Sequence, residues 1–189
     1  MTAGVEPRAV VLVEGESDRV ALAALAARRG RDLVAEGVLI VPMGGVTNIG
    51  RFLDRYGPAG LDLRLAGLTD AGEERHVRRG LARAGLGADL TRAEMAALGF
   101  AVCVDDLEDE LIRAHGIAGM ERVIEAAGEL PSLRRLQRQP AQLGRRPEDQ
   151  LHRFISTRSG RKAVYARLLV DALPLDRIPE PLDRVLAQV

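Results

Sequence analysis

The chain has 189 residues, 47% of them hydrophobic, and its 27 basic side chains balance its 27 acidic ones. This length and apolar fraction suffice for one domain with a buried core. The zero net charge excludes the uniformly basic surface of a constitutive nucleic-acid coat protein, and the single cysteine, Cys103, excludes a disulfide framework within the chain.

The order of apolar runs predicts an α/β protein. Strand-like runs at residues 9–13, 38–41, 63–68 and 100–104 alternate with helical stretches at residues 18–29, 47–56, 73–83 and 92–98. Such alternation is typical of a parallel sheet covered by helices on both faces, as in Rossmann-like folds. Beyond residue 105 only helical periodicity continues, at residues 107–114, 119–127, 148–156, 162–169 and 182–189, and residues 140–147 predict a turn or loop.

We therefore expect two parts. Residues 1–115 form the α/β core, and residues 116–189 form a helical C-terminal extension that packs on it. The sequence contains no signal peptide and no apolar run long enough to span a bilayer, which predicts a cytoplasmic protein that does not bind membranes.

Carboxylates follow the first strand directly. Glu14 comes after four consecutive apolar residues, Gly15 permits a tight turn, and Asp18 follows in the first turn of the next helix, which Ser17 would cap. An open α/β sheet keeps its sites at the carboxyl ends of its strands. The alternative is that both acids merely decorate a strand end and a helix start.

The other strands end in a similar way. The glycine pair Gly44 and Gly45 follows the second strand, where it predicts either a tight turn or a close backbone approach to a ligand. Asp70 follows the third strand, and an acidic run at residues 105–110 follows the fourth. Because parallel strands end at one edge of a sheet, these carboxylates should converge there.

Converging carboxylates repel one another unless a cation compensates them. Oxygen ligands without a cysteine or histidine cluster favour a hard ion, Mg²⁺ or Mn²⁺, and such ions serve phosphoryl chemistry. The three histidines, His76, His115 and His152, fall on predicted helices without a partnered serine or cysteine motif, so we expect surface residues there.

Charge is distributed unevenly along the chain. Residues 100–130 carry eight acids and two arginines, whereas residues 131–170 carry ten cations and two acids. An acidic block beside a basic one suits a metal site next to a groove for a polyanion, although helices with opposite solvated faces would give the same counts. The low aromatic content, 3% without tryptophan, argues against base stacking on single strands.

The ordered set of motifs resembles the Toprim domain. It consists of Glu14-Gly15 with Asp18 after the first strand, Gly44-Gly45 after the second and Thr69-Asp70 after the third. The further run from Asp106 to Leu111 looks most like the Toprim nuclease domain of the OLD family (overcoming lysogenisation defect). Toprim domains occur in topoisomerases, bacterial primases, recombination mediators and several nucleases.

The resemblance implies a metal-dependent DNA-cleaving site. It makes Glu14, Asp70 and Glu108 the main metal-binding acids, with Asp18 and Asp109 beside them, and Glu14 and Asp70 catalytic. In that family a lysine from the helical part completes the site, and Lys162, the only lysine of the sequence, has a similar context. A lysine that merely survives on a helix surface is the alternative. Arg158, Arg161 and Lys162 would contact the nucleic-acid backbone.

Two features depart from the family pattern. Toprim domains generally carry Asp-x-Asp after the third strand, but Gly72 stands at the second position, so Glu73 or Glu74 must replace that acid or one metal site is absent. OLD nucleases normally join this domain to an ATPase, but no Walker-type Gly-x-x-x-x-Gly-Lys occurs here. A separately encoded ATPase partner is therefore expected.

These observations leave three functions open. The first is a Mg²⁺- or Mn²⁺-dependent nuclease that hydrolyses DNA. The second is a ribonuclease of the small Toprim type that processes structured RNA. The third is a Toprim module that has lost catalysis and only binds nucleic acid or protein, which the absence of an acid at Gly72 favours.

Overall fold

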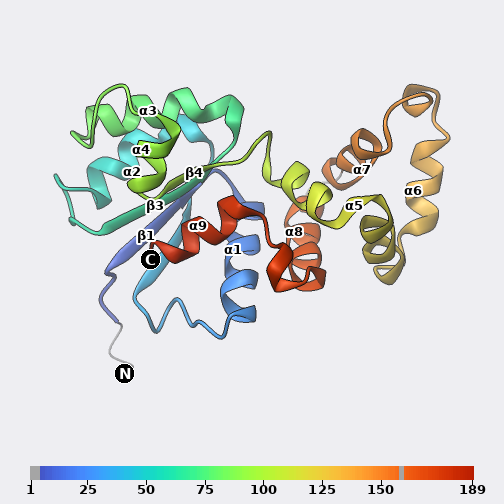
Figure 1. Cartoon of the computed structure of the whole chain (residues 1–189), viewed down its shortest axis with the longest axis horizontal. Helices are drawn as coiled ribbons and strands as arrows, with labels where there is room; N and C mark the ends of the chain where they lie inside the picture. The colour runs from blue at the N-terminus through green and yellow to red at the C-terminus, as the bar shows by residue number, and fades with distance from the viewer. Residues whose placement is uncertain (1–4, 158–159) are drawn as a thin grey trace.

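A four-stranded parallel sheet, with helices around it, forms one half of the protein (Figure 1). The computed structural model describes residues 5–157 and 160–189. The strands are β1 (Ala9–Val13), β2 (Val38–Pro42), β3 (Arg64–Thr69) and β4 (Phe100–Val102), and their order in the sheet is β2-β1-β3-β4. β1 is buried along its whole length and pairs in parallel with both β2 and β3. The predicted α/β fold with a parallel sheet is confirmed.

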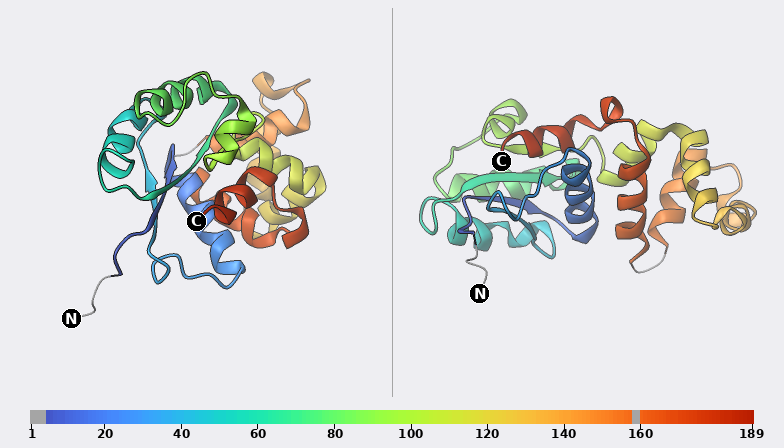
Figure 2. Two further views of the ribbon diagram at one scale, coloured as in Figure 1. Left: turned by 60° about the vertical axis from the view of Figure 1, so that its left-hand side comes forward. Right: turned by 90° about the horizontal axis from the view of Figure 1, so that it is seen from below.

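Two hydrophobic clusters cover the two faces of the sheet. Val10 and Leu12 of β1 pack with α2 (Ile49–Tyr56), α3 (Glu74–Arg83) and α4 (Arg92–Ala97). The alternate β1 residues, Ala9, Val11 and Val13, pack into the cluster that contains α1 (Glu16–Arg28) and α9 (Glu180–Ala187). Successive strand residues point to opposite faces, so a uniformly apolar strand requires helices on both sides. Figure 2 shows the two helical layers.

The remaining helices form a lobe beside the carboxyl edge of the sheet (Figures 1 and 2). They are α5 (Leu107–Ala126), α6 (Leu130–Gln137), α7 (Pro147–Ser156) and α8 (Arg161–Ala172). Gly116 interrupts α5 with φ 65°, which kinks the helix between the sheet and the lobe. The 3₁₀ turns are η1 (Val46–Asn48), η2 (Ala71–Glu73), η3 (Pro140–Gln142) and η4 (Leu175–Arg177). The sequence analysis missed α6.

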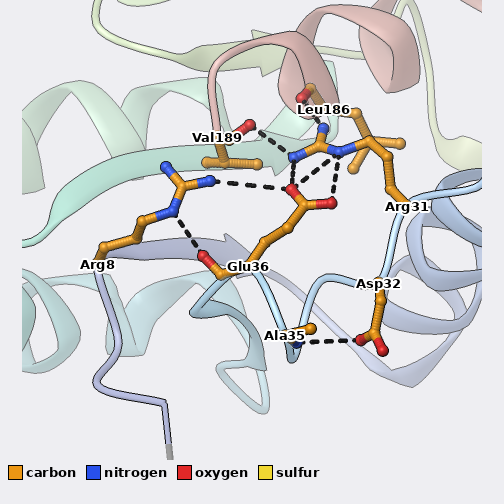
Figure 3. Close-up of polar contacts among 7 residues, drawn as sticks. All are labelled: Arg8, Arg31, Asp32, Ala35, Glu36, Leu186 and Val189. Carbon is orange, nitrogen blue, oxygen red and sulfur yellow. Dashed lines mark hydrogen bonds and ion pairs between the residues drawn. The ribbon is translucent and has the colours of Figure 1, made fainter.

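The chain then returns to the sheet. α9 contacts β3 and β4, and α8 packs along α1, so one hydrophobic cluster runs from the sheet into the lobe. Arg31 holds this return: its guanidinium donates to Leu186 O at 2.6 Å and to Val189 O at 2.8 Å, and pairs with Glu36 (Figure 3). The domain boundary near residue 115 stays a prediction, and α9 lies on the core rather than in the lobe.

The burial of the cysteine agrees with the sequence expectation. Cys103 is fully buried, as the apolar run around it predicts. Among the described residues, no helix is both long and apolar enough to cross a bilayer.

Candidate metal centre

Glu14 and Asp18 lie at the turn from β1 into α1. Glu14 directly follows the buried strand, and the Gly15 N–H donates to Asp18 Oδ2 at 2.8 Å. Asp18 is only 8% exposed. Gly15 is extended, with φ −143°, and is itself the N-cap of α1, so neither the special turn expected at Gly15 nor the cap expected from Ser17 is present. Asp18 instead closes the turn from inside the helix.

The glycine pair after β2 makes the neighbouring turn. Gly44 has φ 68° and Gly45 has φ 114°, conformations that residues with a Cβ rarely adopt. A Cβ at either position would meet no atom within 4 Å, so backbone conformation rather than close packing requires glycine here. The Gly45 N–H donates to Glu14 O at 3.2 Å, which fixes this turn beside the first acid.

Asp70 follows β3 and begins the 3₁₀ turn η2. The two acids that could replace the missing second aspartate behave differently. Glu74 is bound by Arg78 and Arg92, with Nε distances of 3.0 and 2.7 Å. Glu73 lies near enough to Glu14 for its charge to raise the pKa of Glu14. Of the two candidates, Glu73 is therefore the one near the acids.

Glu108 enters the site from the first turn of α5. Asp106 caps this helix by accepting the Asp109 N–H at 2.8 Å. The Glu108 side chain is buried, and its Oε2 accepts a hydrogen bond from Lys162 Nζ of α8 at 3.0 Å. The sequence left open whether Lys162 lies on the surface or in the site. Lys162 contacts Glu108, which is a predicted metal ligand.

His152 of α7 joins the same cluster, contrary to the expectation of a surface histidine. Its Nε2 lies 2.7 Å from Asp106 Oδ2, and a ligand atom of His152, Asp106 and Glu108 each lie within 4.8 Å of one another. No local motif points to His152, because 46 residues separate it from Asp106. Only the position of α7 against α5 brings the two together.

The acids raise one another's pKa. Burial and the charges of Asp18, Glu14, Asp106 and Glu108 raise the pKa of Asp70 to about 7. Burial raises the pKa of Asp18 to about 6, against the hydrogen bond from Gly15, and the charges of Glu108 and Glu14 add to the rise. The pKa of Glu14 is also raised by burial and by Glu73. Carboxylates from three strand ends therefore share one electrostatic environment.

His152 and Lys162 form ion pairs with two of the acids, and these pairs shift the pKa values of the groups involved. Burial raises the pKa of Asp106, but hydrogen bonds from His152 and the Asp109 N–H lower it below its usual value. The hydrogen bond to Asp106 in turn raises the pKa of His152. Burial lowers the pKa of Lys162, but Glu108 more than compensates and raises it. Lys162 and His152 thus bind Glu108 and Asp106, while Asp70 and Asp18 keep their raised pKa values.

Two buried oxygens show where a cation would fit. In the part of the chain that the structure describes, Glu14 Oε2 and Glu108 Oε1 are buried and accept no hydrogen bond. A buried carboxylate oxygen without a partner is costly, and a hard divalent cation satisfies it. Among the described residues, the ligand atoms that lie within 4.8 Å of one another belong to Asp106, Glu108 and His152, whereas Glu14, Asp18 and Asp70 are linked to Glu108 by the influence of their charges. Carboxylate oxygens are the donors that Mg²⁺ and Mn²⁺ prefer, so the chemistry of these residues fits a divalent ion.

Two further predicted residues have other surroundings, and a third is not described. Burial and the charge of Asp106 raise the pKa of Asp109, and Asp109 lines a groove between α5 and α7 together with Asp105, Asp106 and His152. Arg161 is 8% exposed, donates to Phe154 O at 3.0 Å and to Glu129 Oε1 at 2.7 Å, and so cannot reach a nucleic acid as expected. Arg158 lies outside the described residues.

Comparison with known families identifies the sheet and its edge. The family model described as overcoming lysogenization defect protein-like, TOPRIM domain, matches residues 7–71, which include Glu14, Asp18 and Asp70. This part of the chain is similar to an OLD-like Toprim domain. No curated protein sequence matches it.

Solved structures extend the likeness beyond the matched residues. The C-terminal region of the Xanthomonas campestris pv. campestris OLD protein is 27% identical, with a TM-score of 0.72 over 96% of this chain and 94% of that one. The C-terminal region of the Burkholderia pseudomallei OLD protein is 23% identical, with a TM-score of 0.69 over 96% of each, which shows a shared fold. The helical lobe thus belongs to the fold of these C-terminal regions.

Proposed function

We propose that this OLD-like Toprim protein is a nuclease that hydrolyses phosphodiester bonds in DNA with Mg²⁺ or Mn²⁺. One observation carries the proposal: carboxylates from separate strand ends converge, and two of their buried oxygens, Glu14 Oε2 and Glu108 Oε1, have no partner among the described residues. Such an arrangement costs folding free energy and is compensated when a divalent cation binds. The family likeness to OLD proteins supports the same activity.

The ion would be held by Glu14, Asp18, Asp70 and Glu108, with Glu73 in the place of the missing second aspartate. A divalent ion between carboxylates and a phosphate stabilises the attacking and leaving oxygens of the displacement. Asp109 stays a predicted ligand, and the charge that most affects its pKa is that of Asp106. As an acid in the first turn of α5, Asp109 would stabilise the positive end of the helix dipole.

Lys162 would act on the phosphate. Its ammonium lies 3.0 Å from Glu108 Oε2, and its side chain is 45% exposed, so it can also contact a bound polyanion. A positive charge beside the scissile phosphate stabilises the additional negative charge of the transition state. His152 and Asp106 would hold the start of α5, and with it Glu108, in a fixed orientation.

Plasmid cleavage tests the proposal. The purified protein should nick or degrade plasmid DNA with Mg²⁺ or Mn²⁺ and be inactive in EDTA. Glu14→Ala should reduce the cleavage rate by at least about 100-fold, because a ligand at the centre of the acids is lost. Glu16→Ala is the matched control, since Glu16 is exposed and pairs only with Arg19 within the described chain, and it should cleave like the parent. Parental cleavage by Glu14→Ala overturns the assignment.

Gly72 favours a second candidate, a Toprim module that binds without cleaving. Gly72 is exposed and lies in the 3₁₀ turn η2, so no carboxylate follows Asp70 at the usual spacing. Calorimetry separates the two: binding of Mn²⁺ supports the nuclease, whereas salt-sensitive DNA binding without any metal binding supports the module. Structured RNA in the same cleavage assay tests the ribonuclease alternative, and addition of an ATPase tests the expected partner.

A further inference from the structure

A groove between α2 and α3 opens beside the acids. It has a volume of about 340 Å³ and lies on the sheet face opposite α1 and α9. The residues that line it include Thr47 and Asn48 at its start, the arginines Arg51, Arg79 and Arg83, and His76. A Cβ on Gly80 would come within 2.9 Å of Ile49, so a glycine at this position lets the two helices approach closely at the floor of the groove.

The groove is unusually cationic for this chain. Arg51, Arg79 and Arg83 are exposed, and within residues 5–157 and 160–189 none of them forms an ion pair. The neighbouring Arg78 and Arg92, by contrast, are bound to Glu74. Asp54 is the only carboxylate among the residues that line the groove. Three guanidinium groups are therefore free to bind an anionic ligand.

Contacts connect the groove to the acids at two points. Asn48, at the start of the groove, donates its side-chain N–H groups to Met43 O at 2.9 Å and Gly44 O at 3.3 Å, and the next residue, Gly45, donates to Glu14 O. On the α3 side, His76 Nδ1 lies 3.0 Å from Glu73 Oε2, although the geometry does not make a hydrogen bond. The groove thus begins where the carboxylates converge.

We propose that the α2–α3 groove binds the sugar-phosphate backbone of the substrate on one side of the scissile phosphate. Guanidinium groups recognise phosphate oxygens by paired hydrogen bonds, and successive arginines along α3 suit successive phosphates. The inference rests on the proposed function, because the groove would bind the same nucleic-acid strand that the acids would cleave. Contacts of this kind position the substrate without reading its sequence.

A second groove near the acids is less suited to a polyanion. It lies between α5 and α7 and has a volume of about 740 Å³. Its lining combines four arginines with five carboxylates, and Arg146 and Arg113 are already paired with acids; the carboxylates are Asp105, Asp106, Asp109, Glu148 and Asp149. The sequence analysis predicted nucleic-acid contacts in this basic part of the chain, but the charges that line this groove nearly balance.

The salt dependence of DNA binding tests the inference. Fluorescence anisotropy with labelled duplex DNA in EDTA measures the association constant at several salt concentrations, without cleavage. Arg79→Gln/Arg83→Gln should reduce the slope of log K against log salt by about 1.8, because each lost phosphate contact removes about 0.9. At 0.1 M salt the affinity should fall by up to about 60-fold. Arg135→Gln/Arg138→Gln, which removes two exposed arginines at α6, is the control and should keep the parental slope.

Each outcome decides the inference. It is overturned if the groove variant keeps the parental slope, if the α6 variant loses as much, or if the parent binds neither duplex DNA nor a structured RNA of the same length. A loss confined to one of these ligands identifies which backbone the groove binds. Binding is measured without metal, so the two proposals can fail separately. If the groove variant binds DNA more weakly but the parent never cleaves DNA, the groove is supported and the nuclease is refuted. If the parent cleaves DNA but the groove variant binds it like the parent, the nuclease is supported and the groove is refuted.

Discussion

The ionisation of Asp70 depends on its burial and on its neighbours. Its pKa is raised to about 7 by burial and by four surrounding carboxylates. The unfolded chain has neither, so its Asp70 ionises near the ordinary value of 3.8. The folded state then binds more protons than the unfolded state between these two values. Without metal, the contribution of Asp70 to stability is therefore present below about pH 4 and is lost as pH rises to 7.

Asp70→Asn removes this loss. In EDTA we expect the variant to be more stable than the parent at pH 8, and this gain to exceed the gain at pH 5 by roughly 1–2 kcal/mol after allowance for solvent screening. Thermal denaturation at both pH values measures it, as a difference of a few degrees in Tm. Asp176→Asn, at an exposed position, should show no such difference. An equal effect of Asp70→Asn at both pH values contradicts the electrostatic account.

At this scale the sequence predicted part of the site. Glu14, Asp70 and Glu108 follow strand ends, and parallel strands bring such residues to one edge, so their proximity could be predicted. Lys162 could be proposed only from family resemblance, because it comes from α8. His152 was missed, since a histidine on a helix without a local motif gives no sequence signal until the partner helix is placed.

Among the elements, α8 is fixed by a buried arginine. Arg161 begins the helix, donates to Phe154 O, stacks over the Phe154 ring with Cζ 4.3 Å from its centre, and pairs with Glu129. Tyr165 OH, one turn later, donates to Glu129 Oε2 at 2.7 Å. These contacts join α8 to α7 and to the segment before α6, and they set the position of Lys162, the next residue after Arg161.

Arg161→Met tests this structural role. We expect a loss of about 3 kcal/mol in unfolding free energy, because removal of one partner from a buried ion pair leaves polar groups without compensation. Denaturant titration measures the loss, and Arg135→Met, at an exposed position of α6, should change stability by less than about 0.5 kcal/mol. Weaker DNA binding without a loss of stability contradicts the buried role and returns Arg161 to the substrate surface.

Across the whole molecule, two arginines near the end of α1 hold the C-terminal helices. Arg28 donates to Val170 O at 2.6 Å and to Leu173 O at 2.5 Å, at the end of α8. Arg31 donates to Leu186 O in the last turn of α9 and to Val189 O just beyond it, as Figure 3 shows. The last carbonyls of a helix lack partners within it and carry partial negative charge, which a cation stabilises.

Arg31→Met should loosen α9 without unfolding the sheet. We expect a loss of about 1–2 kcal/mol, since hydrogen bonds to a charged donor are lost while water can replace part of them. Hydrogen exchange should become faster in residues 180–187 and stay unchanged in β1. Arg19→Met, which breaks only an exposed pair with Glu16, serves as the control. Equal exchange in α9 of the variant and the parent contradicts this anchoring role.

The sequence by itself determined the parallel sheet, the helices on both of its faces and the edge at which Glu14 and Asp70 lie. These follow from local patterns, because alternation of strands and helices fixes strand direction and the carboxyl end of every strand. Tertiary structure alone decided that His152 joins Asp106, that Arg161 is buried, that α9 returns to the sheet and that the unpaired arginines line the α2–α3 groove. Each of these depends on how helices distant in the sequence pack, and amphipathic helices specify which face is buried but not which neighbour covers it.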